Sequence, residues 1–180
     1  MARILQSVLA LFLAAGLGAT TLERLTVDQM VEKSTSIVRG KVLSASPVQR
    51  GSLIYTVYRL QVMEWIKGST TSTSTEVYVP GGVINGRRQS IAGAPALELG
   101  AEYVVFVWLS PSGTPHIIGL SQGVLSVKMS TSAGAAEAVL SRGPIEDAQV
   151  VDNNGQPTSD AGLKLSLSNL RLRARQAVVR

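Results

Sequence analysis

Residues 53–66 read LIYTVYRLQVMEWI, a run in which side chains alternate between two faces with the period of a β-strand. Glu64 would place a carboxylate on the inner face, so we expect a bulge or bend near residues 63–65. The stretch predicts a long, half-buried strand and, with it, a β-rich fold. The inner face would carry Ile54, Thr56, Tyr58, Leu60 and Val62, and the outer face Tyr55, Val57, Arg59 and Gln61.

Segments on both sides of this run also read as strands. Residues 36–42 alternate, with Val38, Gly40 and Val42 facing inward, and residues 103–109 are apolar throughout, as in a strand covered on both faces. Asn85-Gly86 indicates a two-residue hairpin turn. Because no helices alternate with the strands, we expect a mainly β fold, built as a small antiparallel, OB-like barrel of about seven strands. The remaining strands are predicted at residues 76–79, 83–84, 87–91, 116–118 and 124–129.

Helices are predicted near the two ends of this β-rich region. Thr26, followed three residues later by Gln29, forms a capping-box pattern that predicts a short helix over residues 26–33. Residues 133–142 are interpreted as a brief helix. The last segment has two patterns, a strand-like alternation and a helical stripe, and we favour a helix over residues 168–178. The alternation involves Leu163, Leu165 and Leu167, and the stripe Leu167, Leu170, Ala174 and Val178.

These patterns give a simple domain organisation. We expect a signal peptide at residues 1–19, a β-barrel domain at 20–130, a loop-rich connection at 131–162 and a basic C-terminal helix within 163–180. About 160 residues after the signal suit one domain with its own core.

The first 19 residues carry the features of a secretory signal peptide. Arg3 precedes an apolar core at residues 4–13, and small residues follow that suit cleavage near Gly18 or Ala19. The apolar run falls short of the roughly 20 residues of a spanning helix, so we expect no stable membrane insertion after cleavage. The chain has no cysteine, which excludes disulfides, thiolate metal sites and a cysteine nucleophile. We therefore expect an exported protein, periplasmic or extracellular in a bacterium.

The net charge of +5 is confined to the C-terminal tail. Of the 17 basic residues, five lie after Leu163 and one, Arg3, lies in the signal, which leaves 11 against the 12 acidic residues of the body. A nearly neutral body with few aromatic residues argues against nucleic-acid binding. The tail is interpreted as a solvated helix face, with contact to an anionic surface as the alternative.

Residues 119–123, GLSQG, match the nucleophile motif of serine hydrolases, with Ser121 as nucleophile and His116 as base. In that motif a strand turns abruptly into a helix, whereas residues 124–129 alternate like a strand. We therefore favour a tight glycine-flanked turn and assign no catalytic residue, and keep Ser121 and His116 as the alternative. His116 is the only histidine, and no regular calcium-binding spacing occurs, so we expect neither a metal nor a cofactor.

The candidate binding surface combines the outer face of the long strand with the two arginines after the hairpin turn. Its members are Tyr55, Val57, Arg59, Arg87 and Arg88.

Several short motifs resemble a family of uncharacterised exported bacterial β-rich proteins over residues 21–129. The first half also resembles the OB-like barrel of netrin-type modules, which tissue inhibitors of metalloproteinases use. The resemblance implies that fold, but not the inhibitory mechanism, because those inhibitors chelate zinc through an N-terminal cysteine. The motifs are SIVRGKV at 36–42, Ile54-Tyr55-Thr56, Val62, Lys67-Gly68, Gly93-Ala94-Pro95 and GLSQG at 119–123.

We expect from these observations an exported, non-enzymatic binding module that recognises a protein or a cell-envelope component. One alternative is an exported serine hydrolase that uses residues 119–123, and another is a protease-inhibitor-like module without the cysteine mechanism. A third reading makes the basic C-terminal helix a surface anchor.

Overall fold

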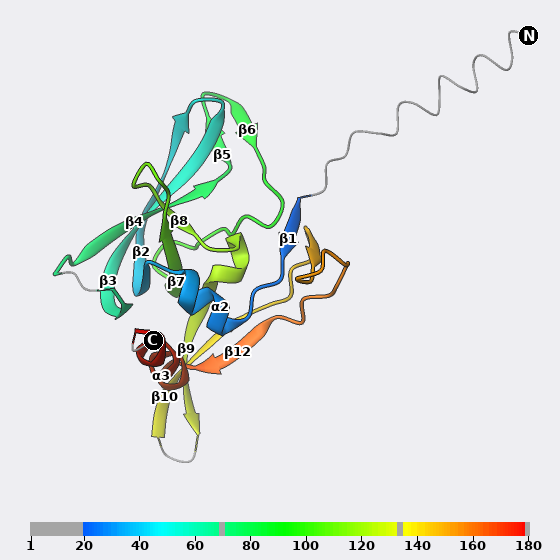
Figure 1. The fold of residues 1–180 in the computed structure, drawn as a ribbon. Coiled ribbons are helices and arrows are strands. Elements are labelled where there is room, and N and C mark those ends of the chain that lie inside the picture. The colour runs from blue at the N-terminus through cyan, green and yellow to red at the C-terminus, as the bar shows by residue number, and fades with distance from the viewer. Residues whose placement is uncertain (1–19, 69–70, 133–134, 179–180) are drawn as a thin grey trace, which may run out of the picture.

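The computed structural model describes residues 20–68, 71–132 and 135–178. The predicted signal peptide lies outside these residues. Strands and two helices follow one another as shown in Figure 1. The elements are β1 (Thr21–Glu23), α2 (Val27–Lys33), β2 (Ser36–Arg50), β3 (Leu53–Lys67), β4 (Ser74–Pro80), β5 (Gly82–Ile84), β6 (Arg87–Gln89), β7 (Glu102–Leu109), β8 (Pro115–Ile117), the 3-10 helix η2 (Leu120–Gly123), β9 (Val124–Ser132), β10 (Ala135–Arg142), β11 (Gln149–Val151), β12 (Leu163–Ser166) and α3 (Leu167–Val178).

Five strands close on themselves in a ring. The main sheet has the order β12-β10-β9-β7-β2-β3-β4-β8, and β8 pairs again with β7 to complete the circuit β7-β2-β3-β4-β8. The ring pairs are antiparallel except β4 with β8, which is parallel and consists of the single pair Tyr78 and His116. The predicted mainly β fold with a short N-terminal and a C-terminal helix is confirmed.

β3 confirms the pattern predicted from residues 53–66. Ile54, Tyr58 and Leu60 are buried, and the alternate Arg59 is exposed. Against β2, the register skips Met63, because Arg39 pairs with Glu64 and Gly40 with Val62. The bulge expected near residues 63–65 is therefore present, and a further shift follows at Ile66.

α2 begins at the predicted capping box, and a lysine side chain caps its C-terminal end. The Thr26 hydroxyl accepts from the Gln29 N–H, and the Gln29 side chain accepts from the Thr26 N–H. At the other end, Lys67 Nζ donates to the carbonyls of Val31 and Ser34, each at 2.6 Å. A cation at the C-terminal carbonyls is favourable because the helix dipole is negative there.

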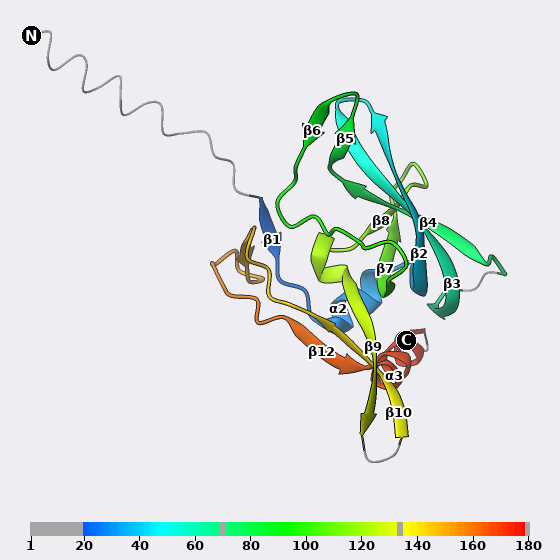
Figure 2. The same ribbon diagram turned by 180° about the vertical axis from the view of Figure 1, so that it is seen from behind.

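The segment after β9 differs from the prediction. Residues 135–142 form strand β10, which pairs antiparallel with β9, so the helix expected at 133–142 is wrong for the described residues. β9 and β10 form a hairpin that projects from the main body in Figures 1 and 2. The loop-rich region 143–162 contains β11, which pairs in parallel with β1.

The last segment forms a strand and then a helix, so both of its predicted patterns occur. Residues 163–166 form β12 beside β10, and the helix α3 follows directly. The helix favoured over residues 168–178 is confirmed, one residue longer at its start. No helix within the described ranges is long and apolar enough to cross a membrane.

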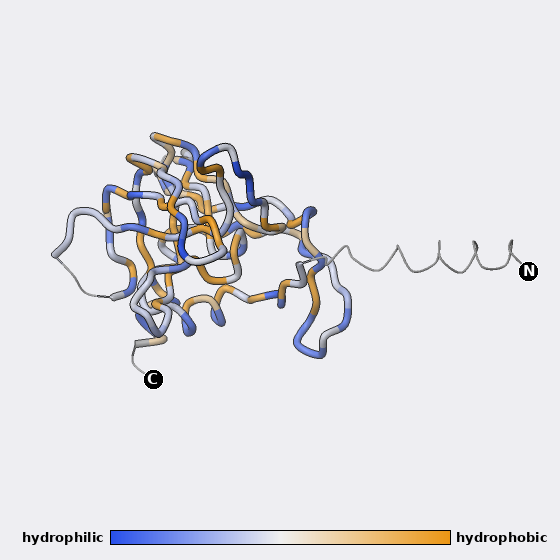
Figure 3. Tube along the Cα trace, turned by 90° about the horizontal axis from the view of Figure 1, so that it is seen from above, coloured by the Kyte–Doolittle hydropathy of each residue, from blue (hydrophilic) through white to orange (hydrophobic). Residues whose placement is uncertain are grey.

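β7 separates two hydrophobic cores, which explains why it is apolar at every position. Val105 and Val107 point into the ring, whereas Val104 and Phe106 pack beneath α2 and α3. Figure 3 shows the hydrophobic residues gathered toward the middle of the main body. The strand thus has both faces covered until its last residues, Trp108 and Leu109, which are exposed.

Candidate functional site

Four aromatic side chains come from four neighbouring strands of the ring. Tyr55 lies on β3, Tyr78 on β4, His116 on β8 and Trp108 on β7. Each alternates with buried residues of its strand that face the ring interior, so all four belong to the outer face. The pairs of Tyr78 with His116 and of Trp108 with His116 bring three of them into register. We call these four residues the aromatic cluster.

His116 lies at the centre of the aromatic cluster. Its ring centroid is 5.8 Å from that of Tyr55, 6.3 Å from that of Tyr78 and 5.5 Å from that of Trp108. The rings are tilted, with interplanar angles between 33° and 70°. The cluster lines an open cleft of about 370 Å³, to which Pro80, Pro95 and Leu120 also contribute. An aromatic, half-open cleft of this kind suits ligand binding.

Arg50, at the end of β2, places a positive charge beside the aromatic cluster, although it does not itself line the cleft. Its guanidinium lies 4.3 Å from the centroid of the Tyr78 ring and donates to the Tyr78 hydroxyl and to Thr114 Oγ1. Burial lowers the pKa of His116, a backbone hydrogen bond with Tyr78 opposes this, and the charge of Arg50 lowers the pKa further. His116 is therefore neutral at pH 7, and Arg50 is the cation beside the cluster.

Two donors of the aromatic cluster are unused. Within the described residues, neither the Tyr55 hydroxyl nor the Trp108 indole N–H has a hydrogen-bond partner. Trp108 is 38% exposed, so part of its side chain is in contact with solvent. By contrast, the indole N–H of Trp65 donates to the Ser72 carbonyl at 3.1 Å.

The residues predicted for the binding surface are distributed over two sides of β3. Tyr55 belongs to the aromatic cluster, and Val57 pairs with Tyr78 beside it. Arg59 is exposed farther along β3. Arg87 and Arg88 are exposed on β6, but their hairpin packs against the opposite face of β3, because Gly81 and Gln89 bond with Thr56 and Ile54.

Sequence reasoning missed Tyr78 and Trp108. The alternation of Val77 and Val79 around Tyr78 was a usable signal for an outward-facing ring. Trp108 lies within residues 103–109, which were predicted to be covered on both faces. That uniformly apolar run gave no sign that coverage by the helices ends at Phe106, two residues before Trp108.

The GLSQG motif is a buried turn and not a strand-to-helix elbow. It forms η2 between β8 and β9, with Gly119 and Leu120 in the left-handed region. Ser121 Oγ is buried, and no residue in the described part of the chain hydrogen-bonds to it, His116 included. A Cβ at Gly123 would lie 2.3 Å from the Ile118 carbonyl oxygen, which explains this glycine sterically.

Gln122 is the residue of the motif whose side chain forms hydrogen bonds to another segment. It is fully buried; its Oε1 accepts from the Leu25 N–H at 2.8 Å and its Nε2 donates to the Glu23 carbonyl at 2.9 Å. The motif therefore attaches the segment between β1 and α2 to the ring.

The three aspartates between β10 and β12 accept hydrogen bonds from groups within the protein. Asp147 accepts from the Gly93 N–H, Asp152 from the N–H groups of Asn154 and Gln156, and Asp160 pairs with Arg142. Across the described residues, no three histidine, cysteine, aspartate or glutamate side chains gather as a metal site would require.

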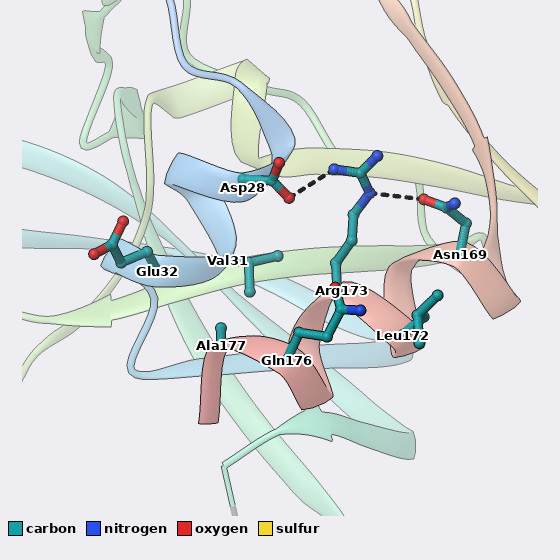
Figure 4. Close-up of a pocket in the computed structure, with 8 residues that line it drawn as sticks. All are labelled: Asp28, Val31, Glu32, Asn169, Leu172, Arg173, Gln176 and Ala177. Atoms are coloured by element: carbon teal, nitrogen blue, oxygen red, sulfur yellow. Dashed lines mark hydrogen bonds and ion pairs between the residues drawn. The ribbon is translucent and has the colours of Figure 1, made fainter. Parts of the chain in front are cut away.

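Two of the five basic residues of the tail pair with carboxylates of the body. Arg171 forms a two-pronged pair with Glu64, both contacts at 2.7 Å, which lowers the pKa of Glu64. Figure 4 shows a second cleft, between α2 and α3, in which Arg173 bonds to Asp28 at 2.6 Å and to Asn169 at 2.8 Å. These pairs hold α3 on the body and leave less positive charge for an external anionic surface.

Comparisons with protein-family models, with curated proteins and with solved structures found no match. The function must therefore be argued from the site alone.

Proposed function

We propose that this chain is an exported, non-enzymatic binding module that recognises a protein or cell-envelope component through the aromatic cluster. The observation that carries the proposal is the convergence of four rings from four strands on an open cleft with two unused donors. Rigid strands position the rings at little entropic cost, which favours binding. The buried Ser121 hydroxyl, without a hydrogen-bonded base, gives the hydrolase alternative no comparable support.

The proposal is tested with a photo-crosslinking residue placed at Pro95, which lines the cleft. The matched control carries the same group at Leu172 on α3, which is 54% exposed. In the native host, we expect a defined adduct from position 95 that is absent from position 172. The adduct should disappear when Tyr55 and Trp108 are replaced by alanine. Equal adducts from both positions, or none from position 95, would contradict the proposal, as would fluorophosphonate labelling of Ser121.

A further inference from the structure

We infer that the aromatic cluster binds an extended, proline-rich segment of a protein partner that carries an acidic residue at one end. This inference rests on the proposed function and names the ligand class of the same site. Hydrogen-bonding capacity, ring geometry and charge support it separately.

The side chains that line the cleft supply unused donors but no charged or amide acceptor. The Trp108 indole N–H can only donate, and the Tyr55 hydroxyl is also unpaired within the described residues. No carboxylate or side-chain amide lines the cleft, and Pro80, Pro95 and Leu120 are apolar. A matching ligand presents acceptors and lacks donors. Proline-rich chain has this property, because proline has a carbonyl but no N–H and the polyproline helix leaves its carbonyls unbonded.

The rings form ridges and not a flat platform. The planes of Tyr55 and Tyr78 meet at 70°, and those of Tyr55 and His116 at 52°. Proline rings can insert between such ridges, as in other aromatic-lined grooves that recognise polyproline helices. A sugar would need a flat stacking face and polar partners for hydroxyls that both donate and accept. The cleft lining lacks carboxylate and amide groups for that purpose.

Arg50 sets the charge of the ligand. Its guanidinium is held over Tyr78 by bonds to the Tyr78 hydroxyl at 2.9 Å and to Thr114 Oγ1 at 2.7 Å. These bonds use two of the five N–H donors of arginine, so donors remain for a carboxylate. Because no acidic side chain lines the cleft, an aspartate or glutamate beside the prolines would complement this cation.

The probe is a synthetic peptide of ten prolines preceded by two aspartates, titrated into the 15N-labelled mature protein. The chain has two tryptophans, Trp65 and Trp108, so the spectrum contains two indole N–H signals. We expect saturable movement of the Trp108 signal while that of Trp65 stays in place. W108F should weaken binding roughly tenfold, and the matched W65F should leave the affinity unchanged.

The contribution of the Arg50 charge to peptide binding is tested with a second pair of variants. R50Q should weaken binding of the aspartate peptide about threefold and abolish its preference over a peptide with two lysines in their place. The matched control R24Q, at an exposed position between β1 and α2, should do neither. A peptide with alanines in place of the prolines should not bind. Movement of the Trp108 signal by cellohexaose but not by the proline peptide would overturn the inference. If the proline peptide does not move the Trp108 signal, the inference is also overturned. In that case an adduct from the photo-crosslinker at position 95 would still support the proposed binding function.

Discussion

Gln122 is the side chain on which attachment of the N-terminal segment depends. Gln122→Ala removes the partners of the Leu25 N–H and the Glu23 carbonyl and leaves a cavity at a fully buried position. We expect the free energy of unfolding to fall by about 3 kcal/mol. Denaturant titration should show a lower midpoint with an unchanged slope. Gln61→Ala, at an exposed position of β3, is the control, and equal losses in the two variants would contradict the assignment.

Ser121 provides the opposite test within the same turn. Its buried hydroxyl has no partner in the described structure, so Ser121→Ala removes an unsatisfied polar group. We expect stability to stay equal or to rise by up to about 1 kcal/mol, measured by denaturant titration. Binding by the aromatic cluster should not change. A large loss of stability, or loss of an esterase activity on this substitution, would show that the hydroxyl has a role that its contacts do not reveal.

The candidate site could be predicted only in part at the level of residues. Tyr55 was found because alternation along β3 places it outside the ring. His116 was considered only as a base or ligand, although it acts as the central ring of the cluster. The cluster depends on which strands are neighbours, and the pairing of Tyr78 with His116 joins segments far apart in the sequence. Local patterns contain no information on such pairings.

Among the elements, the end of β10 is joined to the loop before β12 by the buried pair of Arg142 and Asp160. The Asp160 carboxylate also accepts from the Ile145 N–H at 3.1 Å. Asp160→Asn should lower the free energy of unfolding by about 3 kcal/mol at pH 7, because it leaves the Arg142 charge buried without its partner. The exposed pair of Asp28 and Arg173 is the control, and Asp28→Asn should cost less than about 1 kcal/mol.

The same pair predicts a pH dependence with a defined sign. The hydrogen bond from Arg142 lowers the pKa of Asp160 below its ordinary value of 3.8. The folded state therefore binds a proton less readily than the unfolded state, and the stabilisation is present above pH 3.8. It is lost as the pH falls toward the lower folded-state pKa. The difference in stability between the parent protein and Asp160→Asn should shrink over that range, and a difference constant down to pH 2 would contradict this account.

Elements with strong local signals were predictable, and those that depend on a partner were not. The capping box fixes the start of α2, and Asn85 and Gly86 adopt positive φ in the predicted turn between β5 and β6. β10 was mistaken for a helix because Ala135, Ala136 and Ala138 favour helix in isolation. Pairing with β9 on one side and β12 on the other overrides that preference.

At the scale of the whole molecule, the predicted cleavage site and the start of the fold lie close together. β1 begins at Thr21, and cleavage near Gly18 or Ala19 would leave it intact. β1 pairs with β11, and Arg24 N–H donates to the Val151 carbonyl at 2.8 Å, so residues from 21 onward attach the N-terminal segment to the loop-rich region 143–162. The predicted export signal and the folded domain should therefore be separable at this boundary.

Two truncated forms test that boundary. Removal of residues 1–19 should leave the melting temperature unchanged. Removal of residues 1–25 deletes the β1–β11 ladder and the hydrogen bonds of Gln122 to Glu23 and Leu25. The free energy of unfolding should fall by about 3 kcal/mol or more, which lowers the melting temperature by roughly 6–12 °C. Calorimetry of both forms beside the full chain measures the effect, and mass spectrometry of the exported protein should give a start at residue 19 or 20. If both truncations lower the melting temperature equally, residues 1–19 belong to the folded domain and the interpretation of them as a removable signal is wrong.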